Sequence, residues 1–241
     1  MAKGLADAIV GDIVAADFRA AAVFEQFGID FCCGGRRPLA EACRTAAVDS
    51  AEVIHALNAL PSSPEEAPDL TQWPITRLIN HIVSTHHAYV RSALPTISAY
   101  LEKVIAVHGS RHPELARVSA HFAIVSHDLE QHLLKEEQVL FPYVRELATT
   151  TSSTGRFRSP FGTVENPIRM MEREHRKAAD GLRIIRELTN GYAAPPDGCT
   201  TYAVCMAELD RFERDLHHHV HLENNLLFPR AVELEQACWR N

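Results

Sequence analysis

Apolar residues recur at helical spacing along most of the chain, and no stretch shows the strict alternation of apolar and polar residues that indicates a strand. In the first long pattern, Ile75, Ile79 and Ile82 fall on one face. Four such patterns follow one another along the chain, over about 75–108, 113–147, 166–189 and 200–235. We therefore predict an all-α protein whose main part is an up-down-up-down four-helix bundle.

Two prolines fall inside these patterns. Pro95 is expected to kink the first helix, and Pro142 is expected to break the second. Proline has this effect because it lacks a backbone donor and its ring clashes with the preceding turn. The bundle is therefore predicted to contain one bent and one interrupted helix.

The first 60 residues predict a small helical unit. One helix is expected over about 9–27, ended by Gly28, and two shorter helices over 39–45 and 51–60. Between them lies a tight turn with two exposed-looking thiols, Cys32 and Cys33. A proline-rich, stiff and polar segment follows. The predicted organisation is a helical domain over 1–60, a linker over 61–70 and the bundle over 71–241.

A short motif occurs once in each half of the bundle. His132 precedes Glu136 by four residues, and Leu-Phe-Pro begins four residues after the glutamate; His219 and Glu223 repeat the same arrangement near the C-terminus. On a helix, residues four apart lie on one face, so each copy presents an imidazole and a carboxylate in one direction. Two such pairs are suitable ligands for a transition metal.

The turns between the helices predict that one further histidine joins each pair. Antiparallel helices bring residues level when these are equidistant from the turn, and the three turns around residues 109, 155 and 197 satisfy this condition together. The predicted metal site has a contribution from every helix. Its members are His87, His132, Glu136, His175, His219 and Glu223.

Some neighbouring residues leave alternatives open. Helical phase does not decide between His86 and His87, whereas the repeat selects His219 from the histidines around it. His108 is expected near the turn, about 30 Å from His87 at 1.5 Å per residue, and so outside the site. Glu137 is interpreted as a solvated charge, and Cys199 as a buried thiol without a ligand role.

The number of ligands indicates the metal. Four imidazoles and two carboxylates are too many for one tetrahedral zinc ion. They suit two ions, each with two histidines, bridged by both glutamates, and bridging carboxylates favour iron or manganese. We therefore predict two iron ions with an oxo or hydroxo bridge. The Glu-x-x-His pattern of ferritin-like proteins is absent at these positions, which favours a hemerythrin-like arrangement.

Composition limits the other classes of function. The net charge of −7 argues against nucleic-acid binding. No signal peptide is recognisable at the N-terminus, and no apolar run approaches the ~20 residues that span a bilayer. Six scattered or paired cysteines are too few for a disulfide scaffold, which favours a reducing cytoplasm. The sequence leaves the oligomeric state open, with a homodimer as one form.

With these motifs in place, nearly the whole chain resembles the hemerythrin-like di-iron proteins that repair iron–sulfur clusters. The resemblance rests on the Cys-Cys-Gly-Gly turn at residues 32–35 and on the two motifs that end in Leu-Phe-Pro. It implies a cytoplasmic stress-response protein with a hemerythrin-like bundle, whose iron ligands are the six residues named above. It also implies that damaged or apo iron–sulfur proteins are the partners.

The expected function is repair of clusters damaged by nitric oxide or peroxide, through donation of iron, rather than enzymatic turnover. Cys32 and Cys33 are candidates for a thiol role, since exposed neighbouring thiols can bind iron or pass through oxidised forms; a turn without chemistry is the alternative. Two other functions stay open. One is reduction of nitric oxide or peroxide at the di-iron centre, and the other is reversible binding of oxygen or nitric oxide by a carrier or sensor.

Overall fold

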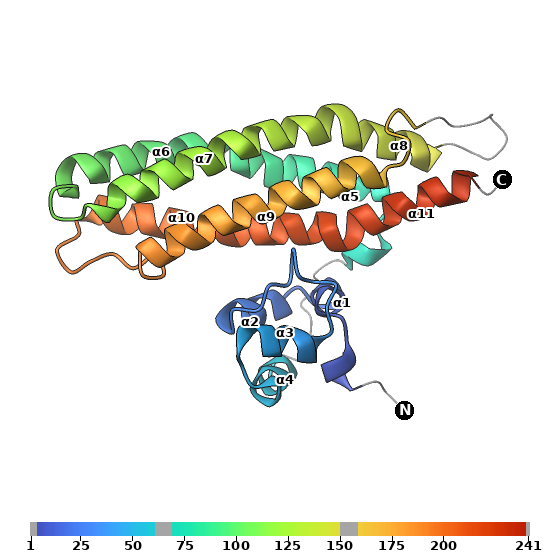
Figure 1. Ribbon diagram of the computed structural model, residues 1–241, viewed down its shortest axis with the longest axis horizontal. Helices are drawn as coiled ribbons and strands as arrows, with labels where there is room; N and C mark the ends of the chain where they lie inside the picture. Colours follow the sequence, from blue (N-terminus) through green and yellow to red (C-terminus); the bar gives the residue numbers. More distant parts are fainter. Residues whose placement is uncertain (1–3, 61–68, 150–158, 240–241) are drawn as a thin grey trace.

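A computed structural model of the protein describes residues 4–60, 69–149 and 159–239. The predicted four-helix bundle is confirmed, and α7 packs on α9 while α6 packs on α10 (Figure 1). The bundle helices are α5 Ile75–His81, α6 Ala88–His108, α7 Glu114–Lys135, α8 Phe141–Thr149, α9 Glu165–Leu188, α10 Thr200–His221 and α11 Phe228–Trp239. None of the helices in these ranges is long and apolar enough to cross a membrane.

The bundle consists of four long rods, namely α5 with α6, α7 with α8, α9 alone, and α10 with α11. Each of the three rods that contain two helices has a wider, π-helical turn between them. These turns cover Ile82–His87, Glu136–Leu140 and Leu222–Leu227. The second one shows that the predicted break at Pro142 is wrong, because the helix continues into α8 with Pro142 in its first turn. A proline is tolerated there, since the expanded turn already alters the backbone hydrogen bonds that its ring would displace. α6 continues through Pro95, and the kink expected there stays a prediction.

The buried apolar residues form two clusters along the bundle. One cluster includes Val90, Leu129 and Leu216 and continues into the small N-terminal unit. The other includes Ile79 and Leu226, together with residues of α8, α9 and α11. A layer of buried histidines and glutamates lies between the two clusters. Because isolated buried charges are costly, the side chains of this layer require partners of opposite charge or hydrogen-bond partners.

The small N-terminal unit consists of α1 Val10–Ala16, α2 Ala20–Gln26, α3 Leu39–Ala46 and α4 Ser50–Asn58. The prediction of one continuous helix over 9–27 is wrong, because Asp17 adopts an extended backbone conformation and ends α1. Its carboxylate accepts a hydrogen bond from the backbone N–H of Arg19 at 3.0 Å. An aspartate that binds the nearby backbone in this way competes with helix continuation.

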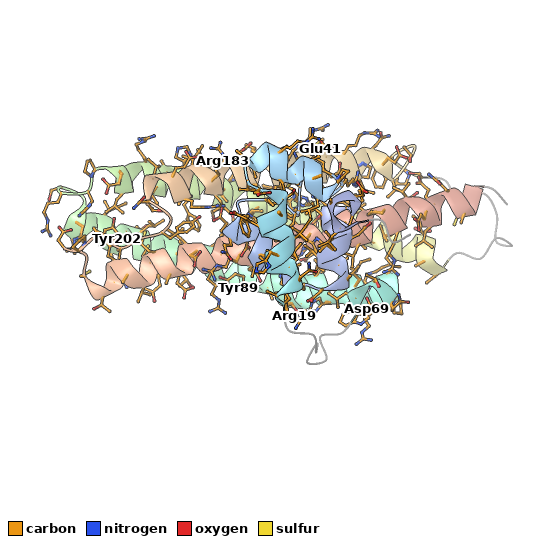
Figure 2. All side chains as sticks on the ribbon, turned by 90° about the horizontal axis from the view of Figure 1, so that it is seen from below. Arg19, Glu41, Asp69, Tyr89, Arg183 and Tyr202 are labelled. Atoms are coloured by element: carbon orange, nitrogen blue, oxygen red, sulfur yellow. The ribbon has the colours of Figure 1, made fainter. Side chains whose placement is uncertain are left out.

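The small unit lies against the middle of the bundle, beside α9 and α10 (Figures 1 and 2). Arg36 of this unit donates to Glu172 of α9 at 2.8 Å. The predicted linker over 61–70 falls mostly outside the described residues, so the division at that point stays a prediction. The unit is therefore placed close to the polar layer of the bundle.

Candidate metal centre

All six predicted ligands are buried and converge in the polar layer. Every rod of the bundle contributes, and the three π-helical turns carry one member each. His87 is the last residue of the first π-helical turn, Glu136 is the first residue of the second, and Glu223 is the second residue of the third. π-helical turns often occur at functional sites, because they move one side chain out of regular helical phase.

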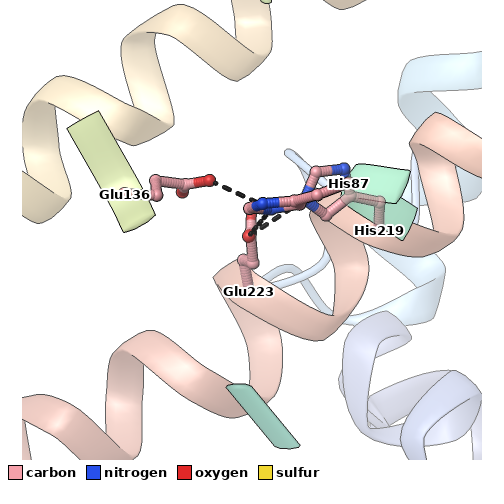
Figure 3. A group of neighbouring side chains, drawn as sticks. All are labelled: His87, Glu136, His219 and Glu223. Carbon is pink, nitrogen blue, oxygen red and sulfur yellow. Dashed lines mark hydrogen bonds and ion pairs between the residues drawn. The ribbon is translucent and has the colours of Figure 1, made fainter. Parts of the chain in front are cut away.

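The six side chains form two overlapping groups of four, and both groups contain both glutamates (Figure 3 draws the first). The first half-site consists of His87 and His219 with the two glutamates, and the second half-site consists of His132 and His175 with the same two. Within each group the candidate ligand atoms lie within 4.8 Å of one another. The structure thus brings together all six predicted residues; their role as ligands remains a proposal.

Each glutamate directs one oxygen to each half-site. Glu136 Oε2 lies 3.4 Å from His87 Nε2, and its Oε1 lies 3.4 Å from His132 Nε2. Glu223 Oε1 lies 3.0 Å from His219 Nε2, and its Oε2 lies 3.1 Å from His175 Nε2. Carboxylates arranged in this way are suited to bridge two ions.

The histidines approach each other closely within each half-site. His87 Nε2 lies 3.1 Å from His219 Nε2, and His175 Nε2 lies 2.9 Å from His132 Nε2. Two imidazole nitrogens at this distance can share one proton at most. Among the described residues, both oxygens of Glu136 have no hydrogen-bond donor. The donor set fits two bound cations, because each cation would accept the lone pairs that are otherwise directed at one another.

The carboxylates shift the protonation of two of the imidazoles. Burial alone would lower the pKa of His87, but Glu136 and Glu223 outweigh burial and raise it to about 10. Burial opposes the charge of His132 in the same way, and Glu136 again prevails and raises the pKa to about 10. Burial would raise the pKa of Glu223, but His219 and His175 bring it well below its usual range. Without a cation, the cluster therefore compensates its carboxylates with protons.

Three of the four histidines have a partner for the outer nitrogen. His87 Nδ1 lies 2.7 Å from Glu137, and His132 Nδ1 lies 2.9 Å from Glu174. These contacts orient the rings so that Nε2 is directed at the cluster. They also show that Glu137 is not a solvated charge, since it contacts both His87 and Arg91.

The outer nitrogen, Nδ1, of the other two histidines has no carboxylate partner among the described residues. His175 Nδ1 lies 3.0 Å from Oδ1 of Asn224, a neutral amide. His219 Nδ1 has no hydrogen-bond partner in the described part of the chain. Its ring instead stacks on that of His86, with centroids 5.7 Å apart and planes 8° apart. Each half-site therefore combines one histidine backed by a carboxylate with one that is not.

The sequence repeat contains the signal for these outer partners. Glu137 follows Glu136 directly, and Asn224 follows Glu223 directly. Each contacts the histidine of the preceding rod, His87 in one case and His175 in the other. Comparison of the residues that follow the two motifs could therefore have predicted the pair.

The alternative histidines lie outside the cluster. His86 Nδ1 is 3.1 Å from Asp215, so the structure favours His87 over His86 as the candidate ligand. His218 stacks on Phe18 of the small unit with ring centroids 3.6 Å apart, and His221 contacts the amide of an asparagine. These residues surround the candidate centre but are not directed into it.

The two turn thiols differ in accessibility. Cys32 is buried and Cys33 is half-buried, so the expectation of two exposed thiols is wrong for Cys32. The Cys32 thiol lies 3.3 Å from Asp30 Oδ1. Its neighbour Cys33, burial and Asp30 raise the pKa of Cys32 well above the usual range, which keeps it protonated. Cys33 lines an open cavity of about 460 Å³ together with Arg37 and Arg176.

His108 lies at the end of α6, away from the cluster, as its distance along the helix predicts. Its ring packs 5.4 Å from Tyr202 and 6.3 Å from His112. The interpretation of Cys199 as a buried thiol is wrong, because Cys199 is exposed at the start of α10. His108, followed by the backbone N–H groups of the first turn of α10, lowers the pKa of Cys199 to about 7.

An all-helical bundle with two overlapping His₂Glu₂ groups defines a cation-binding protein of the hemerythrin type. The family model described as the hemerythrin HHE cation binding domain matches residues 78–231, and a domain of unknown function, DUF542, matches residues 6–61. The second match includes the Cys-Cys-Gly-Gly turn.

Relatives over nearly the full length narrow the class further. The chain is 34% identical over 226 residues to the iron–sulfur cluster repair protein YtfE of Yersinia pestis (strain Pestoides F), which covers 94% of this chain and 97% of the relative. The protein of the same name from Yersinia pseudotuberculosis (serotype O:1b, strain IP 31758) matches with the same identity and coverage. The chain therefore belongs to the family of hemerythrin-like iron–sulfur cluster repair proteins.

Proposed function

We propose that the chain holds two iron ions in this cluster and donates iron to iron–sulfur proteins whose clusters are damaged or missing. The observation that carries the proposal is the pair of four-ligand groups that have Glu136 and Glu223 in common. Each group offers two imidazole nitrogens and two carboxylate oxygens, a donor set that suits iron. The relatives are named iron–sulfur cluster repair proteins, which supports the choice of recipient.

In this proposal both glutamates bridge the ions, and each ion has two histidines of its own. His87 and His219 would hold one ion, and His132 and His175 would hold the other. An oxo or hydroxo bridge between the ions is part of the same proposal. Bound iron supplies the cargo that is handed on. The chain's own contribution is to orient the rings through Glu137 and Glu174 and to exclude water with the two apolar clusters.

The turn of the small unit favours donation over simple carriage. Cys33 is the accessible thiol of the pair, whereas Cys32 is buried and held as a thiol by Asp30. A protein that only binds oxygen reversibly has no need of a thiol beside its metal centre. Cys33 is therefore proposed as the thiol that contacts the iron or the protein that accepts it, and Cys32 is proposed to support the turn beside it.

The test is transfer of iron to an apo-ferredoxin. The purified chain is expected to carry about two irons and, with inorganic sulfide supplied in the assay, to restore the ferredoxin spectrum. Glu136→Leu should abolish both iron binding and transfer, since Glu136 belongs to both half-sites. Glu130→Gln is the matched control, because Glu130 lies exposed on the same helix. A fully loaded wild-type chain that transfers no iron would rule out donation.

The same preparation separates the two remaining functions. Steady consumption of nitric oxide or peroxide with a reductant would indicate a reductase. A stable adduct that forms and dissociates with oxygen would indicate a carrier. Donation predicts neither behaviour and instead predicts a stoichiometric loss of iron from the chain.

A further inference from the structure

Two asparagines connect the candidate metal centre to the small N-terminal unit. Asn224 and Asn225 follow Glu223 directly and lie in the same π-helical turn, Leu222–Leu227. The side-chain amide of Asn225 donates to the backbone carbonyl oxygens of Phe31 and Cys32, both at 3.2 Å. One side chain of the bundle therefore binds the backbone of the Cys32–Cys33 turn.

Two glycines make room for Asn225. A Cβ atom on Gly11 would lie 2.9 Å from Cγ of Asn225, and a Cβ atom on Gly35 would lie 2.9 Å from its amide nitrogen. The two glycines also contact each other, since the N–H of Gly11 donates to the carbonyl oxygen of Gly35 at 2.7 Å. A Cβ atom on Gly35 would also clash with the carbonyl oxygen of Phe31, so the second glycine of the Cys-Cys-Gly-Gly turn is required both by the turn's own backbone and by the close approach of the Asn225 amide.

Asn224 has one end on the metal centre and the other towards the turn. Its Oδ1 is 3.0 Å from His175 Nδ1, and its Nδ2 is 4.0 Å from Cys33 Sγ. An amide oxygen can only accept, so it selects the His175 tautomer that carries the proton on Nδ1. This tautomer leaves the lone pair of Nε2 free for the cluster. Reversal of the amide would place its NH₂ group against the ring.

We propose that Asn224 is a positioning residue through which the seating of the Cys32–Cys33 turn determines how firmly His175 holds its metal ion. The inference rests on the proposed function, because it requires His175 as a ligand. Asn225 anchors the turn to the bundle, and the adjacent Asn224 binds the ring of His175. A displacement of the turn is therefore expected to displace this ring. When the turn leaves its place, the half-site of His132 and His175 is expected to release its ion first.

Variants of Asn224 separate its two contacts. Asn224→Asp keeps an oxygen that accepts from His175 Nδ1 but removes the donor that is directed at Cys33. Asn224→Leu removes both. Loss of an outer hydrogen bond to a metal-bound histidine typically costs about 10- to 100-fold in metal affinity. We expect Asn224→Leu to release one of the bound irons about 10- to 100-fold faster. We expect Asn224→Asp to retain both irons as long as the Cys32–Cys33 turn stays in its place on the bundle.

Gly11→Ala tests the connection from the far side, without a change in the bundle. Its Cβ would lie 2.9 Å from Cγ of Asn225 and 3.1 Å from the carbonyl oxygen of Gly35. We expect these contacts to displace the turn from its place on the bundle. Gly4→Ala is the matched control, because a Cβ atom there would meet nothing within 4 Å. We expect Gly11→Ala, but not Gly4→Ala, to accelerate release of the same iron as Asn224→Leu. Unfolding of the small unit by Gly11→Ala would also unseat the turn, so the expectation does not depend on its stability.

The experiment follows release of iron(II) from the loaded full-length chain to the colorimetric chelator ferrozine, together with hydrogen exchange of the backbone at residues 31–35. A purely structural contact would change hydrogen exchange in Gly11→Ala and leave iron release as in the wild type, which would overturn the inference alone. A wild-type chain that takes up no iron would overturn the proposed function and the inference with it. Faster release of one iron in both Gly11→Ala and Asn224→Leu supports the connection.

Discussion

The two halves of the sequence repeat place different residues beside equivalent members of the candidate metal centre. After its glutamate, the first half has the carboxylate Glu137 and the second half has the amide Asn224. Before His87 the first half has His86, and before His175 the second half has Glu174. A carboxylate on the outer nitrogen increases the basicity of a ligating histidine more than an amide does.

The difference between Glu137 and Asn224 shows how equivalent positions of the repeat can make different contacts. Glu137 contacts His87 and Arg91, and both of these residues belong to the bundle. Asn224 has a donor as well as an acceptor, so it can contact His175 and also approach Cys33 of the small unit. Each half-site keeps one histidine backed by a carboxylate, and the half-site of His132 and His175 is in addition connected to the small unit through Asn224.

The largest expected effect comes from the residues that the half-sites have in common. Glu136→Gln and Glu223→Gln should each reduce the iron content from about two per chain to below about one, because either change removes a bridging carboxylate from both groups. Metal analysis of the purified variants checks this. Loss of only one iron in either variant would mean that the glutamate serves a single half-site.

The outer carboxylates should have the next largest effect. Glu137→Gln weakens the partner of His87, and Glu174→Gln weakens the partner of His132, so each acts on a different half-site. We expect a loss of about 10- to 100-fold in affinity for one iron in each variant. Competition with a chelator of known affinity measures it. Equal loss of both irons in either variant would contradict the division into halves.

The pH dependence of the metal-free chain should be smaller but has a definite sign. The pKa values of His87 and His132 are raised to about 10, so their stabilising contribution is complete below the ordinary value of about 6.5 and is lost as the pH rises to about 10. The midpoint of thermal unfolding should therefore fall by several degrees between pH 7 and pH 10. His87→Gln and His132→Gln should each remove part of this slope.

Iron binding should depend on pH in the opposite direction and become weaker as the pH falls. A metal ion competes with the protons on His87 and His132, so loading at pH 7 should release protons into a weakly buffered solution. A loaded chain is accordingly expected to lose iron as the pH falls. Loading without proton release would show that neither histidine is a ligand.

The smallest effect on the centre is expected from His108. His108→Gln lies at the far end of α6 and should leave the iron content of both half-sites unchanged. It should instead raise the pKa of Cys199 from about 7 towards that of an ordinary thiol, about 8.5. The pH profile of alkylation at Cys199 measures this, since only the thiolate reacts. A change in iron content would show that the two ends of the bundle are coupled.

The bundle and the convergence of the six side chains follow from the sequence because helical period and turn position are local properties. The heights of His87 and His175 on their rods could be worked out from the turns alone. The role of Asn225 could not be predicted, since its amide lies between Gly11 and Gly35 from the other end of the chain. The burial of Cys32 escaped prediction for a similar reason, because Cys32 belongs to the apolar cluster that includes residues of both the small unit and the bundle.

The three π-helical turns have a consequence for how the centre can be lost. A turn of this kind is a regular helix with one inserted residue, and the rods on either side of it remain in phase with the two apolar clusters. Deletion of a single residue, such as Gln138, should therefore restore an ordinary helix and a stable bundle while it removes the wide turn that begins at Glu136. The scaffold and its cargo site are separable by one codon.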